Sequence, residues 1–256
     1  AGPAGLEAAC VLAERGLKPI VYEQDSVIGG LIRLATKPPK KKNMEQIISY
    51  REQRLKQFGI TIHLNTQVND ELLAQEKPDI LFVATGSKPL IPPIRGLEGD
   101  HIYTGDSVLH GSVSVGKKVA VLGGGLIGIE TADYLAEQGK QVHVFETDSD
   151  VARSLNESRR YFLMDRIQQN NIQIHTNTKV IEVRLPKIII SNGTSEQTVD
   201  GFDSIVVAAG RVANCPPITK WAQDFPEMKI LIIGDASGSG LAIDAIYQAA
   251  VAAAGL

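Results

Sequence analysis

Short apolar runs alternate with longer amphipathic stretches along this chain, a pattern typical of strands followed by helices. The clearest case lies near the middle of the sequence. There the apolar run 119–122 predicts a strand, residues 126–138 predict a helix that ends at Gly139, and residues 141–146 predict a second strand. Alternation of this kind predicts a parallel sheet covered by helices, so the expected fold class is α/β.

Three glycines occupy the turn between the first of these strands and the helix, in the spacing Gly123-x-Gly125-x-x-Gly128. In such a turn the first glycine permits the sharp bend, the second lets a pyrophosphate approach bare backbone, and the third lets the helix pack closely on the strand. Glu146 ends the next strand, where a carboxylate accepts hydrogen bonds from an adenine ribose. The complete unit favours a dinucleotide site over glycines that serve packing alone.

The same unit occurs twice. A shift of 123 residues places the N-terminal stretch on the central one without a gap, which indicates an internal duplication. The matched positions include Gly2 with Gly125, Gly5 with Gly128, and Glu23 with Glu146. Residues 60–68 and 79–86 likewise resemble 172–180 and 203–210. We expect two tandem Rossmann-like units, the first of which lacks the equivalent of residues 117–123, its first strand and first glycine.

Proline-rich segments mark the expected domain boundaries, because proline interrupts both helices and strands. Residues 88–96 carry the chain out of the first unit, and residues 214–217 bring it back. The first domain is therefore expected to comprise residues 1–104 and 214–256, with a second domain of residues 105–213 inserted. A buried strand (228–235) and a final helix (241–254) would complete the first domain.

The two halves also differ in what they add to the shared unit. The first half carries extra sequence at 29–42, followed by a predicted helix at 44–58. The second half has an extra ribbon at 187–191, followed by the hairpin signal Asn192-Gly193. The lysines at 40–42 read as a solvated surface run, with contact to a phosphate or a partner domain as the alternative.

Composition narrows the class of protein. The chain has 256 residues, 43% of them hydrophobic, and a net charge of −3. The sequence has no stripe of basic residues that would indicate nucleic-acid binding. It has neither a membrane-spanning run nor a basic leader, so we expect a cytoplasmic protein with no membrane segment. Cys10 and Cys215 are far apart, which predicts no disulfide or dithiol centre, and Cys10 is expected to pack in a helix. The histidines show no metal-ligand spacing, and His143 is expected to be buried on a strand.

Several further motifs point to one family. The tandem units, the turns 84–86 and 209–211, and Gly234-Asp235 resemble the flavoprotein pyridine-nucleotide reductase superfamily over essentially the whole chain. Within it, Glu23 followed by Gly29-Gly30, the segment 37–39 and residues 64–66 resemble the C-terminal half of the NADH:flavin oxidoreductases related to old yellow enzyme. That group includes the 2,4-dienoyl-CoA reductase and 2-enoate reductase types.

The resemblance implies that the first domain binds FAD and the inserted domain binds NAD(P)H. The residues implied for FAD are Gly2, Gly5, Glu23, Gly29, Gly30, Thr85, Gly86, Gly234 and Asp235. Those implied for NAD(P)H are Gly123, Gly125, Gly128, Glu146, Gly210 and Arg211. For Asp235 the alternative is a helix N-cap beside Ser237, and for Arg211 it is an ordinary surface arginine.

The expected reaction is hydride transfer from the nicotinamide to the flavin, which needs no catalytic side chain and no metal. A carboxylate at Glu146 suits the 2′-hydroxyl of NADH and repels the 2′-phosphate of NADPH, so NADH is favoured. Arg153, a few residues further on, keeps NADPH possible.

The partner implied by the resemblance is an upstream barrel domain of the same polypeptide that carries FMN and an iron–sulfur cluster. The chain would then be the electron-input half of a larger enzyme. Two alternatives remain open. One is a self-sufficient enzyme like a ferredoxin or rubredoxin reductase, which would need a small redox protein as partner. The other is a non-catalytic module that binds adenine nucleotides, because the missing strand would weaken the flavin pocket.

Overall fold

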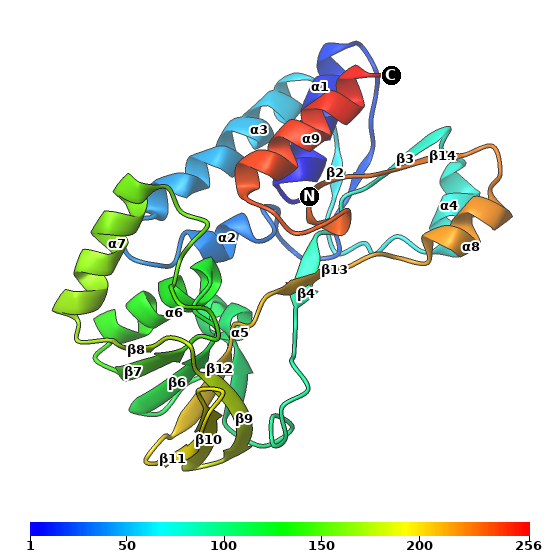
Figure 1. Cartoon of the computed structure of the whole chain (residues 1–256). Coiled ribbons are helices and arrows are strands. Elements are labelled where there is room, and N and C mark those ends of the chain that lie inside the picture. The colour runs from blue at the N-terminus through cyan, green and yellow to red at the C-terminus, as the bar shows by residue number, and fades with distance from the viewer. The chain divides into compact units, whose positions relative to one another are not determined.

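A computed structural model describes all 256 residues and divides them into two compact units (Figure 1). The first unit consists of Ala1–Thr36, Asn43–Lys88 and Val212–Leu256, and the second of Lys37–Lys42 and Pro89–Arg211. The second unit is thus an insertion in the first. Its bounds differ from the expected 105–213, because residues 89–104 include β5 (Ile102–Thr104), a strand of the second unit's own sheet.

The second unit contains a five-stranded sheet in the order β5, β12 (Ser204–Val207), β6 (Lys118–Leu122), β7 (Gln141–Phe145) and β8 (Gln173–His175). All neighbouring strands in it are parallel. From the central β6 the chain proceeds outward to β7 and β8, and later returns to the other side of β6 as β12. In an open α/β sheet a reversal of this kind leaves a crevice at the carboxyl ends of the strands, where ligands bind.

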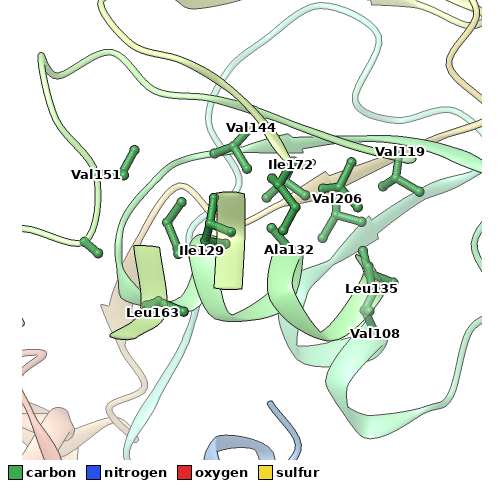
Figure 2. Close-up of a cluster of buried hydrophobic side chains, with 14 of the residues drawn as sticks. Val108, Val119, Ile129, Ala132, Leu135, Val144, Val151, Leu163, Ile172 and Val206 are labelled. Atoms are coloured by element: carbon green, nitrogen blue, oxygen red, sulfur yellow. The ribbon is translucent and has the colours of Figure 1, made fainter. Parts of the chain in front are cut away.

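Helices α5 (Gly105–His110), α6 (Leu126–Glu137) and α7 (Glu157–Gln169) cover one face of this sheet. Figure 2 shows the core there, in which Ile129, Ala132 and Leu135 of α6 face strand residues such as Val144, Val206 and Val119. The expected helix of residues 126–138 is confirmed, and Gly139 follows it with φ +77°. The close packing of helices on parallel strands explains why the strands read as unbroken apolar runs.

The opposite face of the sheet packs on an antiparallel ribbon of β9 (Lys179–Arg184), β10 (Lys187–Ser191) and β11 (Glu196–Val199). Ile188 of the ribbon is fully buried in a cluster with Leu122 and Phe145 of the sheet. The predicted extra ribbon is therefore confirmed. Because both faces of β6 are covered, all of its residues after Lys118 are buried.

The first unit holds two separate strand pairs. The strand β1 (Val21–Tyr22) is parallel to β2 (Ile62–His63), and β3 (Ile80–Val83) is parallel to β14 (Lys229–Ile232). By the duplication, β1 and β2 correspond to β7 and β8, and β3 corresponds to β12; β14 pairs with β3 as β5 pairs with β12. The position that β6 occupies in the second unit has no strand here. The expected buried strand at 228–235 is wrong in its burial, since β14 pairs on one side only and Ile232 is exposed.

Three helices pack side by side in the first unit, with α1 (Pro3–Glu14) in contact with both α3 (Gln46–Gln57) and α9 (Ala242–Ala254) (Figure 1). Alanines form the α1–α9 contact, which lets the two helices approach closely. Cys10 is buried against α3, 3.6 Å from the carbonyl oxygen of Arg51, so its expected packing role is confirmed. The remaining helices are α2 (Ile32–Ala35), η1 (Lys42–Glu45), α4 (Asp70–Glu76), α8 (Ile218–Asp224) and η2 (Gly234–Ala236).

By these bounds the chain passes between the units four times, and two of the passages run through β4 (Ser87–Pro89) and β13 (Arg211–Ala213), which pair with each other. The expected linkers 88–96 and 214–217 follow these strands, and no strand or helix continues through their prolines after Pro89. No helix of the structure has both the length and the apolar character needed to span a bilayer.

Candidate functional site: two glycine turns, each with an acid

The glycine turn after β6 divides its tasks among its residues. A Cβ added to Gly123, which has φ +108°, would lie 2.4 Å from the carbonyl oxygen of Ala208. One added to Gly128 would lie 1.9 Å from the carbonyl oxygen of Gly123. A Cβ on Gly125 would meet nothing within 4 Å. The outer glycines are thus required by close packing, whereas the middle one faces open space, as a phosphate-binding turn requires.

Gly125 is also the N-cap of α6, and no side chain caps this helix. The amides of its first turn therefore remain available to an anion, which the helix dipole also favours. A bare helix N-terminus behind a glycine without neighbours fits the pyrophosphate of a dinucleotide.

Glu146 follows β7 and lies against this turn. Its Oε2 accepts a hydrogen bond from the Gly124 amide at 2.5 Å, and its Oε1 accepts from the Asp148 amide at 2.8 Å and the Thr147 hydroxyl at 3.0 Å. A carboxylate offers about four acceptor positions, two on each oxygen. Three are used, so Oε2 retains one for a ribose hydroxyl.

Gly124 is a site residue that the sequence analysis missed. A Cβ there would lie 2.6 Å from Cγ1 of Val151 and 2.9 Å from Cβ of Glu146. Residue 124 must lack a side chain so that the acid can reach the turn. The run of three consecutive glycines was the available signal, but the motif spacing assigns no task to its middle member.

The carboxyl end of β12 leads to Gly210 and Arg211. Gly210 has φ +118°, and its carbonyl oxygen accepts a hydrogen bond from Leu90 at 2.9 Å. The Arg211 guanidinium donates to both carboxylate oxygens of Asp106, at 2.7 and 2.9 Å, and is almost completely buried. Arg211 is therefore no ordinary surface arginine.

A small cavity lies beside this pair, and its lining includes Gly105, Asp106, Ile127, Gly210 and Arg211. Asp106 was missed because helix α5 was not expected. The signal was Thr104-x-x-Ser107, since these two side chains form the capping box that starts α5 and places Asp106 in its first turn.

In the first unit the same arrangement recurs. Gly2 is the N-cap of α1, again without a capping side chain. A Cβ on Gly5 would lie 3.3 Å from Cβ of Ala84, as one on Gly128 would lie 3.4 Å from Cβ of Ala208, the matching residue. The backbone oxygen that crowds Gly128 has no counterpart beside Gly5.

Glu23 repeats the contacts of Glu146. Its Oε2 accepts from the amino group of Ala1 at 2.5 Å, and its Oε1 accepts from the Asp25 amide at 3.0 Å. Its carbonyl oxygen accepts from the Thr66 amide at 2.8 Å, as that of Glu146 accepts from Thr178. The duplication therefore extends to single hydrogen bonds.

Gly29 and Gly30 form the adjoining turn. Both have positive φ, +117° and +49°. The Gly29 amide donates to the Ala1 carbonyl oxygen at 2.9 Å, and a Cβ on Gly30 would lie 3.1 Å from Cα of Gly2. The structure thus brings this pair against Gly2.

Thr85, Gly86 and Asp235 also come together within the first unit. The Thr85 hydroxyl donates to the carbonyl oxygen of Asn214 at 2.5 Å, and the Asn214 amide donates to the carbonyl oxygen of Gly86 at 2.9 Å. Asp235 accepts from the Ser87 hydroxyl at 2.8 Å and from the Gly240 amide at 3.3 Å. Asp235 therefore joins the end of β14 to β4 instead of capping a helix at Ser237.

Gly234, which precedes Asp235, begins η2 with φ +60°. Its amide donates to Oε1 of Gln248 on α9 at 2.7 Å. This contact holds the turn that carries Asp235 to the first turns of α9.

The lysine run at 40–42 is not simply a solvated surface run, which corrects the expectation. Lys41 lies 2.5 Å from Oε1 of Glu130, a buried residue on α6. Burial raises the pKa of Glu130, and the ammonium of Lys41 acts in the opposite direction. Glu7, the duplicate of Glu130, accepts from Nε of Arg51 at 2.7 Å. Sequence spacing could not predict either pair, since each joins segments far apart in the chain.

His143 lies partly buried on β7, as expected, with its Nδ1 3.1 Å from Nε2 of His175. Burial lowers the pKa of His143 to about 4 and lowers that of His175 as well. Two neutral imidazoles suit one hydrogen bond, in which one ring donates and the other accepts. No group of three potential metal ligands occurs in the structure, and both cysteines are free.

Two glycine turns, each at a helix N-terminus and each with an acid on the following strand, are the arrangement of a dinucleotide-binding protein. The family model of the pyridine nucleotide-disulphide oxidoreductases matches residues 1–224, so the chain belongs to that family. Membership indicates that the chain binds FAD and NAD(H).

Among its relatives, the NADH oxidase of Thermoanaerobacter brockii is 33% identical over 250 residues, covering 96% of this chain and 38% of that protein. The cinnamate reductase of Clostridium sporogenes is 32% identical over 97% of this chain and 37% of its own length. A 2-naphthoyl-CoA reductase structure superposes with a TM-score of 0.90 at 30% identity, covering 98% of this chain and 38% of that one. The chain thus spans less than two fifths of these proteins.

Proposed function

We propose that this chain passes hydride from NADH, bound by the second unit, to FAD, bound by the first, as the electron-input part of a larger NADH:flavin oxidoreductase. The observation that carries the proposal is the duplicated site: a glycine turn, a bare helix N-terminus and an acid held against the turn by a hydrogen bond. Each copy suits one adenine dinucleotide.

In the second unit, the amides at the start of α6 bind the pyrophosphate of NADH, and Gly125 lets it approach. Glu146 accepts a hydrogen bond from a hydroxyl of the adenosine ribose at the remaining acceptor position of its Oε2. Gly210 and Arg211, at the carboxyl end of β12, lie on the other side of the switch point beside β6, where the nicotinamide half extends. Asp106 holds the Arg211 side chain in place.

In the first unit, the start of α1 and Gly2 take the pyrophosphate of FAD, and Glu23 takes its adenosine ribose. Gly29 and Gly30 close the turn against Gly2. The carboxyl ends of β3 and β14 carry Thr85, Gly86 and Gly234-Asp235. There Asp235 accepts hydrogen bonds from hydroxyl groups of the ribityl chain. The two cofactors supply the hydride chemistry, and the protein supplies binding and orientation.

The rest of the electron path lies outside these residues. We propose that it runs to an upstream domain of the same polypeptide with an FMN and an iron–sulfur cluster, where an enoate-type substrate is reduced. The extra length of the relatives supports an additional domain, and the names cinnamate reductase and 2-naphthoyl-CoA reductase support substrates with conjugated double bonds.

A visible absorption spectrum of the purified chain, taken after incubation with FAD and removal of the excess, tests the proposal. We expect bound flavin in a ratio near one to one, and loss of its absorbance when NADH is added without oxygen. Bound flavin that NADH does not bleach would contradict hydride transfer.

A second candidate is a nucleotide-binding module without turnover. The observation in its favour is that the bare helix N-terminus of α6 and the acid Glu146 fit an adenine nucleotide whether or not hydride is passed on. On this alternative the protein stays colourless after incubation with FAD, while calorimetry still detects NADH binding to the second unit.

A further inference from the structure

The loop that follows Glu146 folds back onto the glycine turn. The Ala152 amide donates to the carbonyl oxygen of Gly124 at 2.8 Å, and Val151 packs where a Cβ of Gly124 would stand. Ala152 is buried with φ +52°. The backbone of Arg153, the next residue, therefore lies at the edge of the proposed nucleotide site.

The Arg153 side chain returns toward the acid. Its Nη1 lies 2.9 Å from Oδ2 of Asp148, and the amide of Asp148 itself donates to Oε1 of Glu146. Both partners of the ion pair are more than half exposed. The guanidinium thus pairs with the residue whose backbone amide binds the carboxylate proposed to bind the ribose, and its charge is already matched by Asp148.

This arrangement bears on the choice between NADH and NADPH, which differ only by a phosphate on the 2′-oxygen of that ribose. A phosphate beside Glu146 needs a cation, and an arginine near this position is the usual means of accommodating it. Here the cation is paired with a second carboxylate, which also repels the phosphate. Glu146, Asp148 and Arg153 together carry a net charge of about −1.

We propose that Asp148 is a second specificity-determining residue, which excludes NADPH by keeping Arg153 in an ion pair and by adding negative charge beside Glu146. The proposal rests on the NADH site assigned above to the second unit. It follows that removing this one carboxylate releases a cation in the place where a 2′-phosphate would lie.

Asp148 can be changed without disturbing the loop. Its amide binds Glu146, and its carbonyl oxygen accepts from the Asn177 amide at 2.9 Å, so the backbone is fixed by contacts that any residue keeps. Its carboxylate makes one ion pair and is exposed. Asp148→Asn is therefore the variant of choice, and Asp150→Asn is a matched control, because Asp150 is a neighbouring exposed acid that pairs with a different arginine, Arg160.

The experiment measures binding of NADH and of NADPH by calorimetry to the 256-residue chain and its variants. We expect the unaltered protein to prefer NADH. Asp148→Asn should tighten NADPH binding about 3- to 10-fold and change NADH binding less than about 2-fold. Asp150→Asn should leave the ratio of the two affinities unchanged.

In the double variant Asp148→Asn/Arg153→Gln the gain toward NADPH should disappear. A gain that persists there would contradict the role of Arg153, and an unchanged ratio in Asp148→Asn would overturn the proposal while leaving the NADH site intact. If the unaltered protein binds neither nucleotide, the NADH site itself is wrong, and this inference fails with it.

Discussion

The two glycine turns of this chain share a sequence pattern and differ in what stands behind them. In the second unit β6 enters the turn from the centre of a five-stranded sheet, and Gly123 brings its carbonyl oxygen against Gly128. In the first unit no strand lies between β1 and β3, and Gly5 has only the side chain of Ala84 nearby. The contacts made by the acid and the helix start are therefore local, whereas the tight packing of the third glycine depends on the strand.

The matched pair Gly128→Ala and Gly5→Ala should show the largest effect. A methyl group on Gly128 would overlap backbone that cannot move freely, so we expect a loss of at least about 3 kcal/mol in the free energy of unfolding. On Gly5 the added contact is mild and alanine favours a helix, so stability should stay within about 1 kcal/mol of the unaltered protein.

Urea unfolding followed by circular dichroism measures both variants. Equal effects of the two substitutions would contradict the difference between the two turns, because they would mean that Gly5 is crowded to the same extent as Gly128.

The duplicated glutamates offer a second comparison, because Glu130 pairs with Lys41 and Glu7 pairs with Arg51. Lys41→Met leaves Glu130 buried without its ion-pair partner, and we expect a loss of about 1–3 kcal/mol in the free energy of unfolding. The folded-state pKa of Glu130 is already raised above its unfolded value, and the variant would raise it further. The stability that Glu130 contributes is therefore present at low pH, where it is protonated, and is lost as the pH rises through its folded-state pKa. Unfolding curves at several pH values should show this slope.

Lys41→Met/Glu130→Gln is the control for this prediction. The double variant removes the buried charge together with its partner, so it should recover most of the stability and lose the pH slope. A double variant as unstable as Lys41→Met would show that the lysine acts through packing instead of charge.

The histidine pair exists only in the second unit, because Ile20 takes the place of His143 in the first. His143 has its pKa lowered to about 4, so unfolded chains bind more protons between pH 6.5 and 4. The stability from its burial is present above pH 6.5 and is lost as pH falls toward 4. Allowing for partial exposure, we expect a loss of about 1–2 kcal/mol, measured by thermal unfolding.

His143→Ile introduces the residue of the first unit at this position. It should flatten the stability profile between pH 6.5 and 4, leaving the smaller slope due to His175. An unaltered profile would mean that the acid sensitivity arises elsewhere in the chain.

Much of the fold was predictable from the sequence, because the strand, turn and helix signals around Gly123 are local and the duplication supplies a second reading of them. The extents of strands were less predictable. Residues 60–68 resemble 172–180 along their whole length, yet only Ile62 and His63 pair with β1, since a parallel partner is present over that short length alone.

The glycines and acids of the candidate site were predictable for the same reason, because each belongs to a contiguous motif. Their ionic partners were not. Lys41 meets Glu130 across 89 positions and Arg211 meets Asp106 across 105, and no periodicity records such a contact. Exposed pairs such as Asp148 with Arg153 are close in sequence, but their geometry depends on how the loop folds back on Gly124.

The assignment of one cofactor to each unit is the central claim, and a crossed pair of variants tests it most directly. NADH binding is measured by calorimetry and FAD binding by flavin fluorescence for Glu146→Gln and Glu23→Gln. Loss of a charged acceptor for a ribose hydroxyl should weaken binding about 10-fold. The account predicts that Glu146→Gln weakens NADH and leaves FAD unchanged, whereas Glu23→Gln weakens FAD and leaves NADH unchanged. The reverse assignment, or equal loss of both cofactors in each variant, would contradict it.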